Sequence, residues 1–140
     1  MAATKQDRSA RWFQRVVWLG IAANVALGIP TLLAPERMIE FASLPPPVPL
    51  LWVRFSALLL VLLSVFYTPA AYDCSRYRTV AWLAVMSRLA GVLFFSAQPA
   101  DYRLFGLFDL VFFIPEGILL ILAGRSQASA SREHLEGQHP

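Results

Sequence analysis

Four ionisable residues lie within otherwise apolar stretches of this sequence: Arg54, Arg88, Asp109 and Glu116. A charged side chain at the centre of a membrane costs roughly 2.5–3.5 kcal/mol on insertion scales, so such residues usually face the interior of a helix bundle and pair with one another. A guanidinium and a carboxylate can form two parallel hydrogen bonds, which satisfy both groups without water. These four residues are therefore the main candidates for internal chemistry.

The depth of each residue in its apolar stretch predicts which charges meet. At about 1.5 Å per residue, Arg54 and Asp109 lie roughly 6 and 8 Å from one membrane boundary, and Arg88 and Glu116 roughly 13 and 10 Å from the other. We therefore predict two ion pairs, Arg54 with Asp109 and Arg88 with Glu116. Asp109 and Glu116 are seven residues apart and share nearly the same helix face. Asn24, at mid-depth in the first stretch, is the predicted additional polar partner.

Two interpretations of these charges remain open at this point. In the first, the pairs fix the register of the helices and neutralise one another, as polar contacts between membrane helices often do. In the second, the carboxylates form part of a proton path or bind a polar head group. The triplet Pro115-Glu116-Gly117 favours the second interpretation, because Pro115 frees the carbonyl of Val111 and Gly117 allows close backbone approach.

Composition and length define the fold class. The chain has 140 residues, enough for one domain, and 57% of them are hydrophobic while 15% are charged, against about 25% charged in soluble domains. Mean hydropathy is +0.55. We predict an all-α polytopic membrane protein, a four-transmembrane-helix bundle formed by residues 1–124, with a disordered cytoplasmic tail over 125–140. The predicted spans are residues 12–33, 50–67, 79–95 and 104–123, each long enough for a hydrocarbon core of about 30 Å.

The first span is predicted to be a retained helix and not a cleaved signal, because its apolar run exceeds the about 7–15 residues of a signal core. Orientation follows from the basic residues in the short flanks. One side carries Lys5, Arg8, Arg11, Arg76, Arg78, Arg125 and Arg132, whereas the other carries Arg37 and Arg103. We therefore expect a multi-pass protein of the inner membrane with both termini cytoplasmic.

The first outer loop, from Pro35 to Leu44, has the pattern of a short helix. Pro35 suits the first helical turn, and Glu36 is favourable beside the positive end of the helix dipole. The helix must end before the proline run that begins at Pro45. We predict a short interfacial helix lying on the outer leaflet; the alternative is an ordered loop packed over the mouth of the bundle.

Several classes of function are disfavoured by the residue inventory. The net charge of +3 does not indicate nucleic-acid binding, because the basic residues lie at segment ends and form no clustered face. Both histidines, His134 and His139, lie in the tail, which argues against bis-histidine haem and histidine-bearing di-iron sites in the bundle. Cys74 is the single cysteine. With no catalytic triad, phosphate loop or metal-ligand cluster, we expect no cofactor and no autonomous enzyme.

The layout of the chain resembles that of small bacterial DoxX-like membrane proteins. The resemblance covers about Arg11 to Gly124 and consists of four spans, a first helix that runs into a proline-containing outer loop (Gly28-Ile29-Pro30-Thr31-Leu32-Leu33-Ala34-Pro35), and an arginine early in the second helix (Trp52-Val53-Arg54). Some members of that group are associated with respiratory or redox membrane complexes. The resemblance implies a non-catalytic accessory or assembly subunit. The alternative is a small carrier or a lipid- or quinone-binding protein that uses the intramembrane Arg/acid cluster. The expected partners of the chain are membrane lipids, together with a membrane-complex protein if it is a subunit, or a quinone or lipid ligand if it is a carrier or binding protein.

Overall fold

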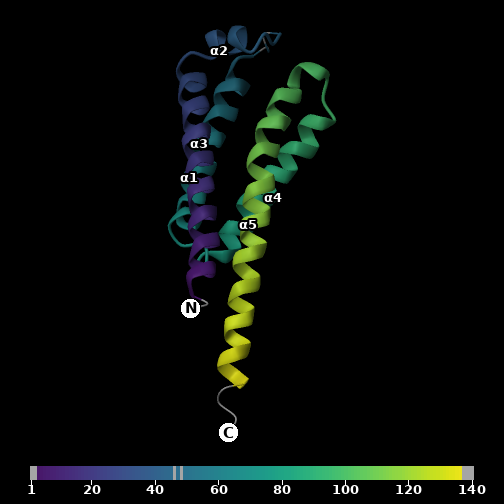
Figure 1. The fold of residues 1–140 in the computed structure, drawn as a ribbon. Helices are drawn as coiled ribbons and strands as arrows, with labels where there is room; N and C mark the ends of the chain where they lie inside the picture. Colours follow the sequence, from purple (N-terminus) through teal and green to yellow (C-terminus); the bar gives the residue numbers. More distant parts are fainter. Residues whose placement is uncertain (1–2, 46, 48, 137–140) are drawn as a thin grey trace.

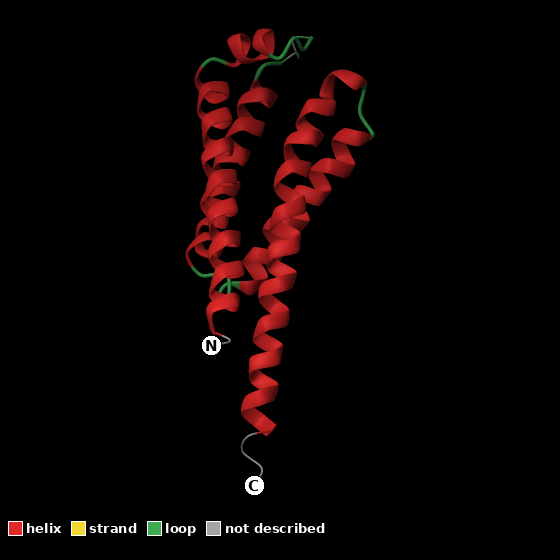
Figure 2. Cartoon of the chain, in the orientation of Figure 1, coloured by secondary structure: helices red, strands yellow, loops and turns green. Residues whose placement is uncertain are grey.

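The structure is a computed structural model that describes residues 3–45, 47 and 49–136. It is helical, with no strand among these residues (Figures 1 and 2). The elements are α1 (Ala3–Leu33), α2 (Pro35–Phe41), α3 (Leu51–Tyr72), α4 (Arg78–Ser96), the 3-10 turn η1 (Ala100–Tyr102) and α5 (Arg103–Glu136). The predicted all-α class is confirmed.

Four of the helices are long and apolar enough to cross a membrane. The qualifying segments are Arg8–Leu33, Leu51–Tyr72, Arg78–Ser96 and Ala100–Arg125. They overlap the four predicted spans, and at 19 to 26 residues each lies in the length range of membrane-spanning helices. The number of spans follows directly from the hydropathy of the sequence.

The short helix α2 forms where the sequence predicts it. Pro35 occupies the first turn together with Glu36, as expected for a helix N-terminus. The helix ends in a Schellman motif, in which the backbone N–H of Leu44 donates to the Ile39 carbonyl at 3.1 Å and that of Ser43 donates to the Glu40 carbonyl at 3.0 Å. Ser43 adopts a φ of 54° at the position that such caps require.

The long helices form two antiparallel pairs. α1 packs along α3, α4 packs along α5, and α1 also contacts α5. The N-terminus, the α3–α4 loop and the far end of α5 lie at one end, and α2 and the α4–α5 connection lie at the other (Figure 1). We call the half of the bundle next to the N-terminus the terminal half, and the half next to α2 the α2 half.

The apolar core lies in the terminal half. It joins the beginning of α1, the end of α3, the beginning of α4 and the end of the apolar part of α5. Its buried members are Phe13, Val17, Ile21, Tyr67, Ala70, Ala71, Cys74, Ala81, Ala84, Val85 and Leu120. Four of these are alanines, so the helix backbones approach closely, as small residues allow in membrane proteins.

In the α2 half, the two helix pairs diverge (Figure 1). In α1, burial falls in that direction: Asn24 is buried, whereas Thr31, seven residues further along, is partly exposed. Within the α1–α3 pair, close packing continues, since a Cβ added at Gly28 would lie 2.8 Å from Val61 Cγ2.

Two helices extend beyond the predicted ends. The second span was predicted to end at residue 67, but α3 continues through Pro69 to Tyr72, where Ala70 and Ala71 pack into the core. The predicted disordered tail, residues 125–140, is helical through Glu136 as part of α5. Extending an existing helix needs no new nucleation, which explains why a polar segment continues it. Residues 137–140 lie outside the described part.

Candidate functional site

Arg88 of α4 is the centre of a polar cluster at the boundary between the two halves. Its side chain lies near the middle of a span and the residue is 4% exposed. Nη1 donates a hydrogen bond to Asp109 Oδ1 of α5 at 2.8 Å, which is also a salt bridge, and another to Asn24 Oδ1 of α1 at 3.2 Å. One guanidinium nitrogen therefore ties together three helices from both pairs.

Two aromatic rings of α5 complete the surroundings of the guanidinium. The Arg88 Cζ lies 5.0 Å from the ring centroid of Phe112 and 5.6 Å from that of Phe108. The faces of aromatic rings attract cations, and the attraction is strongest away from water. Phe108, Asp109 and Phe112 thus contact the same cation from little more than one turn of α5.

Glycines make room for the charged groups on both sides of the cluster. A Cβ added at Gly91 of α4 would lie 2.0 Å from Asp109 Oδ2, so the carboxylate rests directly on the α4 backbone. A Cβ added at Gly20 of α1 would lie 3.1 Å from Arg88 Nη2 and 3.4 Å from Glu116 Oε1. The spacing of these glycines had no evident chemical meaning in the sequence, and their role depends on which side chains face them.

Glu116 of α5 lies below this network, towards the terminal half. The residue is 2% exposed, and its Oε2 atom is buried without a hydrogen-bond partner. Its Oε1 atom and Arg88 Nη2 both lie against Gly20. Buried polar atoms are nearly always hydrogen-bonded in native structures, so this orphan oxygen requires an explanation.

The predicted pairing of the four charges is wrong. Asp109 pairs with Arg88 and not with Arg54, and Glu116 is not the ion-pair partner of Arg88 among the described residues. The estimated depths assigned Arg88 and Asp109 to different ion pairs. The long arginine side chain, however, lets its guanidinium reach a carboxylate about one helical turn away along the membrane normal. The predicted role of Asn24 as an additional polar partner is confirmed.

Arg54 lies outside the cluster, and it is exposed. It shares a stripe of α3 with Val61, seven residues away, which faces Gly28 of α1. Tyr67, which faces α4, lies about 140° from Arg54 around the helix, at 100° per residue. Arg54 therefore points away from α4 and α5, one turn inside the end of its helix, where a long side chain can reach a polar boundary.

A second polar contact, between Tyr67 of α3 and Ser87 of α4, was missed by the sequence analysis. The two hydroxyl oxygens form a short hydrogen bond, and Ser87 Oγ also donates to the Ala84 carbonyl at 2.8 Å. The sequence did hold a signal for this contact. Tyr67 lies five residues before the end of α3 and Ser87 lies nine residues after the start of α4, so both hydroxyl-bearing residues are inside the same end of adjacent antiparallel helices.

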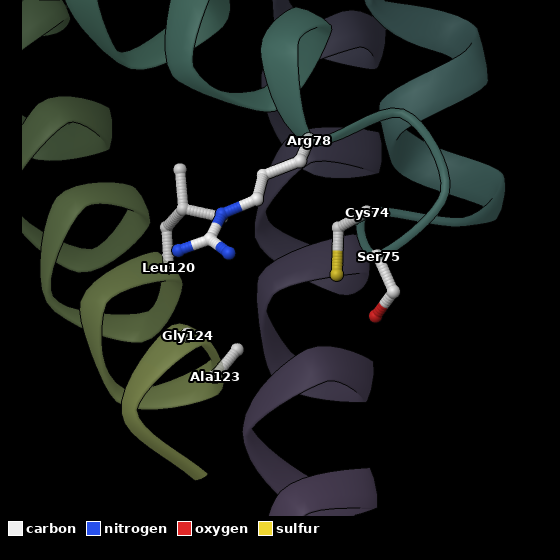
Figure 3. A pocket seen from close by; sticks show the side chains of 6 residues that line it. All are labelled: Cys74, Ser75, Arg78, Leu120, Ala123 and Gly124. Atoms are coloured by element: carbon white, nitrogen blue, oxygen red, sulfur yellow. The ribbon is translucent and has the colours of Figure 1, made fainter. Parts of the chain in front are cut away.

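Two hollows occur away from the charged cluster. The first, beside the α3–α4 loop, has a volume of about 10 Å³ and is lined by Cys74, Ser75, Arg78, Leu120, Ala123 and Gly124 (Figure 3). That volume is at the lower limit for a single water molecule. Burial raises the pKa of the Cys74 thiol above its usual value, which disfavours the reactive thiolate.

The second hollow is an open groove between α4 and α5 in the α2 half. It has a volume of about 350 Å³ and is lined by Val92, Ser96, Arg103, Gly106, Leu107 and Leu110. Leu110 projects about 100° around α5 from its neighbour Asp109. The groove therefore opens on a different side of the helix from the ion pair.

The described residues contain no group of three or more His, Cys, Asp or Glu side chains that could hold a metal ion. The chain matches no protein-family model, no curated protein and no solved structure. The geometry of the cluster and of the two halves is therefore the basis for the functional conclusion.

Proposed function

We propose that this chain is an integral membrane protein that acts as a non-catalytic accessory or assembly subunit of a larger membrane complex. The observation that carries the proposal is the contrast between a closed terminal half and an α2 half in which the helix pairs diverge. Helix pairs that diverge from each other over half their length offer a surface for helices of another protein. The layout resemblance to DoxX-like proteins favours a complex of respiratory or redox type.

The topology supports a specific orientation within this proposal. The N-terminus, the α3–α4 loop and the end of α5 share one end of the bundle (Figure 1), and the basic flanks Arg8, Arg76 and Arg78 belong to that end. By the positive-inside rule, this end is cytoplasmic in the inner membrane. The short helix α2 then lies at the outer interface, where the exposed Phe41 can enter the lipid head-group region.

A photo-crosslinking experiment tests the subunit proposal. A photoreactive amino acid is placed at Leu63, which is 40% exposed and lies one turn from Tyr67 towards the α2 half, or at Leu83, which is 61% exposed in the terminal half. The protein is then purified from its native membranes in mild detergent, and crosslinked products are identified by mass spectrometry. A stoichiometric membrane-protein adduct is expected at position 63 and not at position 83. Recovery of the protein alone, without an adduct at position 63, would contradict the proposal.

The orphan oxygen of Glu116 favours a second candidate function. A small carrier or a lipid- or quinone-binding protein would use the Arg88, Asp109 and Glu116 side chains as its polar site. Under this candidate, Glu116→Gln abolishes transport or ligand retention while the fold survives. Under the subunit proposal, the same variant assembles normally with its partner. Co-purification of one bound lipid or quinone, in place of a partner protein, would favour the second candidate.

A further inference from the structure

The charges of the polar cluster do not balance. Arg88 supplies one positive charge, and Asp109 neutralises it through the salt bridge at 2.8 Å. Glu116, which is 2% exposed, would add a second carboxylate without a counterion in the same region. An isolated carboxylate is strongly disfavoured in an apolar interior and becomes neutral by binding a cation, most simply a proton.

The groups that face Glu116 offer no other means of neutralising it. From α4 the facing charged group is Arg88, which is already bound to Asp109; from α3 the titratable group is Tyr67, whose hydroxyl is bonded to Ser87. From α1 the neighbours are Gly20, which has no side chain, and Asn24, which accepts from Arg88. The described residues therefore leave Oε2 of Glu116 without a donor.

We propose that Glu116 is a proton-binding site inside the bundle, where one exchangeable proton on its carboxyl group is the ligand that balances the charge of the cluster. Binding forms an O–H bond on the carboxylate, and release returns the proton to solvent. After release, the nearby Nη2 of Arg88, which borders the same glycine, is the cationic group that faces the new charge. This site exists whether or not the chain assembles with a partner protein.

Infrared spectroscopy of the protein reconstituted in lipid nanodiscs at neutral pH tests the proposal directly. The wild-type protein is expected to show the carbonyl-stretch band of a protonated carboxylic acid, with a small shift in D₂O. Glu116→Gln should lose this band, because the amide has the size of the neutral acid and no acid group. Asp109→Asn removes the counterion of Arg88, so Glu116 should ionise in its place and the band should be lost, whereas Glu40→Gln, at an exposed carboxylate, should retain the band.

Three outcomes would overturn the proposal. The first is a wild-type protein without the band, or a band that persists in Glu116→Gln. The second is loss of the band when Na⁺ replaces a large organic cation in the buffer, which would make the site one for a metal cation. The third is failure of Glu116→Gln to fold, as judged by circular dichroism and gel filtration, since an amide should replace a neutral acid without disruption.

Discussion

The terminal half and the α2 half of the bundle are built from the same four helices but are held together differently. In the terminal half, alanines and a few large side chains such as Phe13 and Val17 form a closed core. In the α2 half, the pairs diverge, and close packing persists mainly within the α1–α3 and α4–α5 pairs. Hydropathy alone does not produce a closed bundle, because lipid solvates an apolar side chain as well as another helix does.

The polar cluster lies where these two halves meet. The apolar core lies on one side of it and the pairs diverge on the other, and Arg88 joins α1 to the α4–α5 pair through its bonds to Asn24 and Asp109. The Asp109 side chain remains 16% exposed, whereas Glu116, one layer deeper, is 2% exposed. Arg88 and its two partners therefore link α1, α4 and α5 at the end of the core that borders the α2 half.

The largest loss of stability is expected when the Arg88 side chain is removed. Arg88→Ala leaves Asp109 as an unpaired, partly buried carboxylate and removes both ring contacts, so we expect a loss of about 3 kcal/mol in the free energy of unfolding. Reversible unfolding in bicelles measures it. Arg54→Ala is the matched control, because Arg54 is exposed, and it should change stability by less than about 0.5 kcal/mol. Equal effects of the two substitutions would contradict the assigned pairing.

A smaller effect is expected when the space for Asp109 is filled. Gly91→Ala places a Cβ 2.0 Å from Asp109 Oδ2, which forces the carboxylate off the helix and should cost about 2–3 kcal/mol. At Gly117, the same substitution meets Val85 Cγ1 at an ordinary 3.7 Å. Gly117→Ala should be neutral or stabilising by up to about 1 kcal/mol through helix propensity. If both variants unfold alike, the close approach at Gly91 is not a constraint.

The core itself gives the next test of the comparison between halves. Phe13 is completely buried in the terminal half, and Phe41 is 85% exposed in the α2 half. Phe13→Ala should cost about 2 kcal/mol, since the cavity remains costly even where lipid replaces water as the solvent. Phe41→Ala should change the free energy of unfolding by less than about 0.5 kcal/mol. A larger loss at Phe41 would place part of the folding energy in the α2 half.

The smallest effect concerns reactivity and not stability. Cys74 is buried at the edge of the core, and burial raises the pKa of its thiol. The thiolate is the reactive form, so alkylation of Cys74 should be slow at neutral pH and should accelerate at a higher pH than for an ordinary thiol. A cysteine at the exposed position 75, in the variant Cys74→Ser with Ser75→Cys, provides the reference. The rates are measured in quenched maleimide reactions over a range of pH. If Cys74 and the cysteine at position 75 react at similar rates with similar pH profiles, the terminal half opens readily.

Much of the fold was predictable because each span carries its own signal. A helix that crosses a membrane satisfies its backbone hydrogen bonds internally, so its existence depends on a local apolar run and little else. The helix α2 was predictable for a similar reason: Pro35 and Glu36 favour a start, and the prolines from Pro45 require an end. The continuation of α3 through Pro69 was not, since the packing of Ala70 and Ala71 stabilises it.

The sequence predicted most of the residues that form the candidate site, but it did not predict which of them pair with one another. Arg88, Asp109, Glu116 and Asn24 were identified because charged and amide groups are costly in an apolar span, and the structure brings these four together. Arg54 satisfied the same criterion but lies on the side of α3 that faces away from α4 and α5. Residue type and depth give no information on the rotation of a helix about its axis.

By itself, the sequence determined the four spans, the short helix α2 and the set of polar residues that must be buried or reach a boundary, because these depend on local composition and on the cost of charge in an apolar medium. The tertiary structure alone decided that Arg88 pairs with Asp109, that Glu116 keeps an orphan oxygen, and that the core closes only in the half where Phe13 and Leu120 lie, as far as the described residues extend. Those features depend on how each helix is rotated and which neighbour it faces. Both are set by the packing of small and large side chains from all four helices at once.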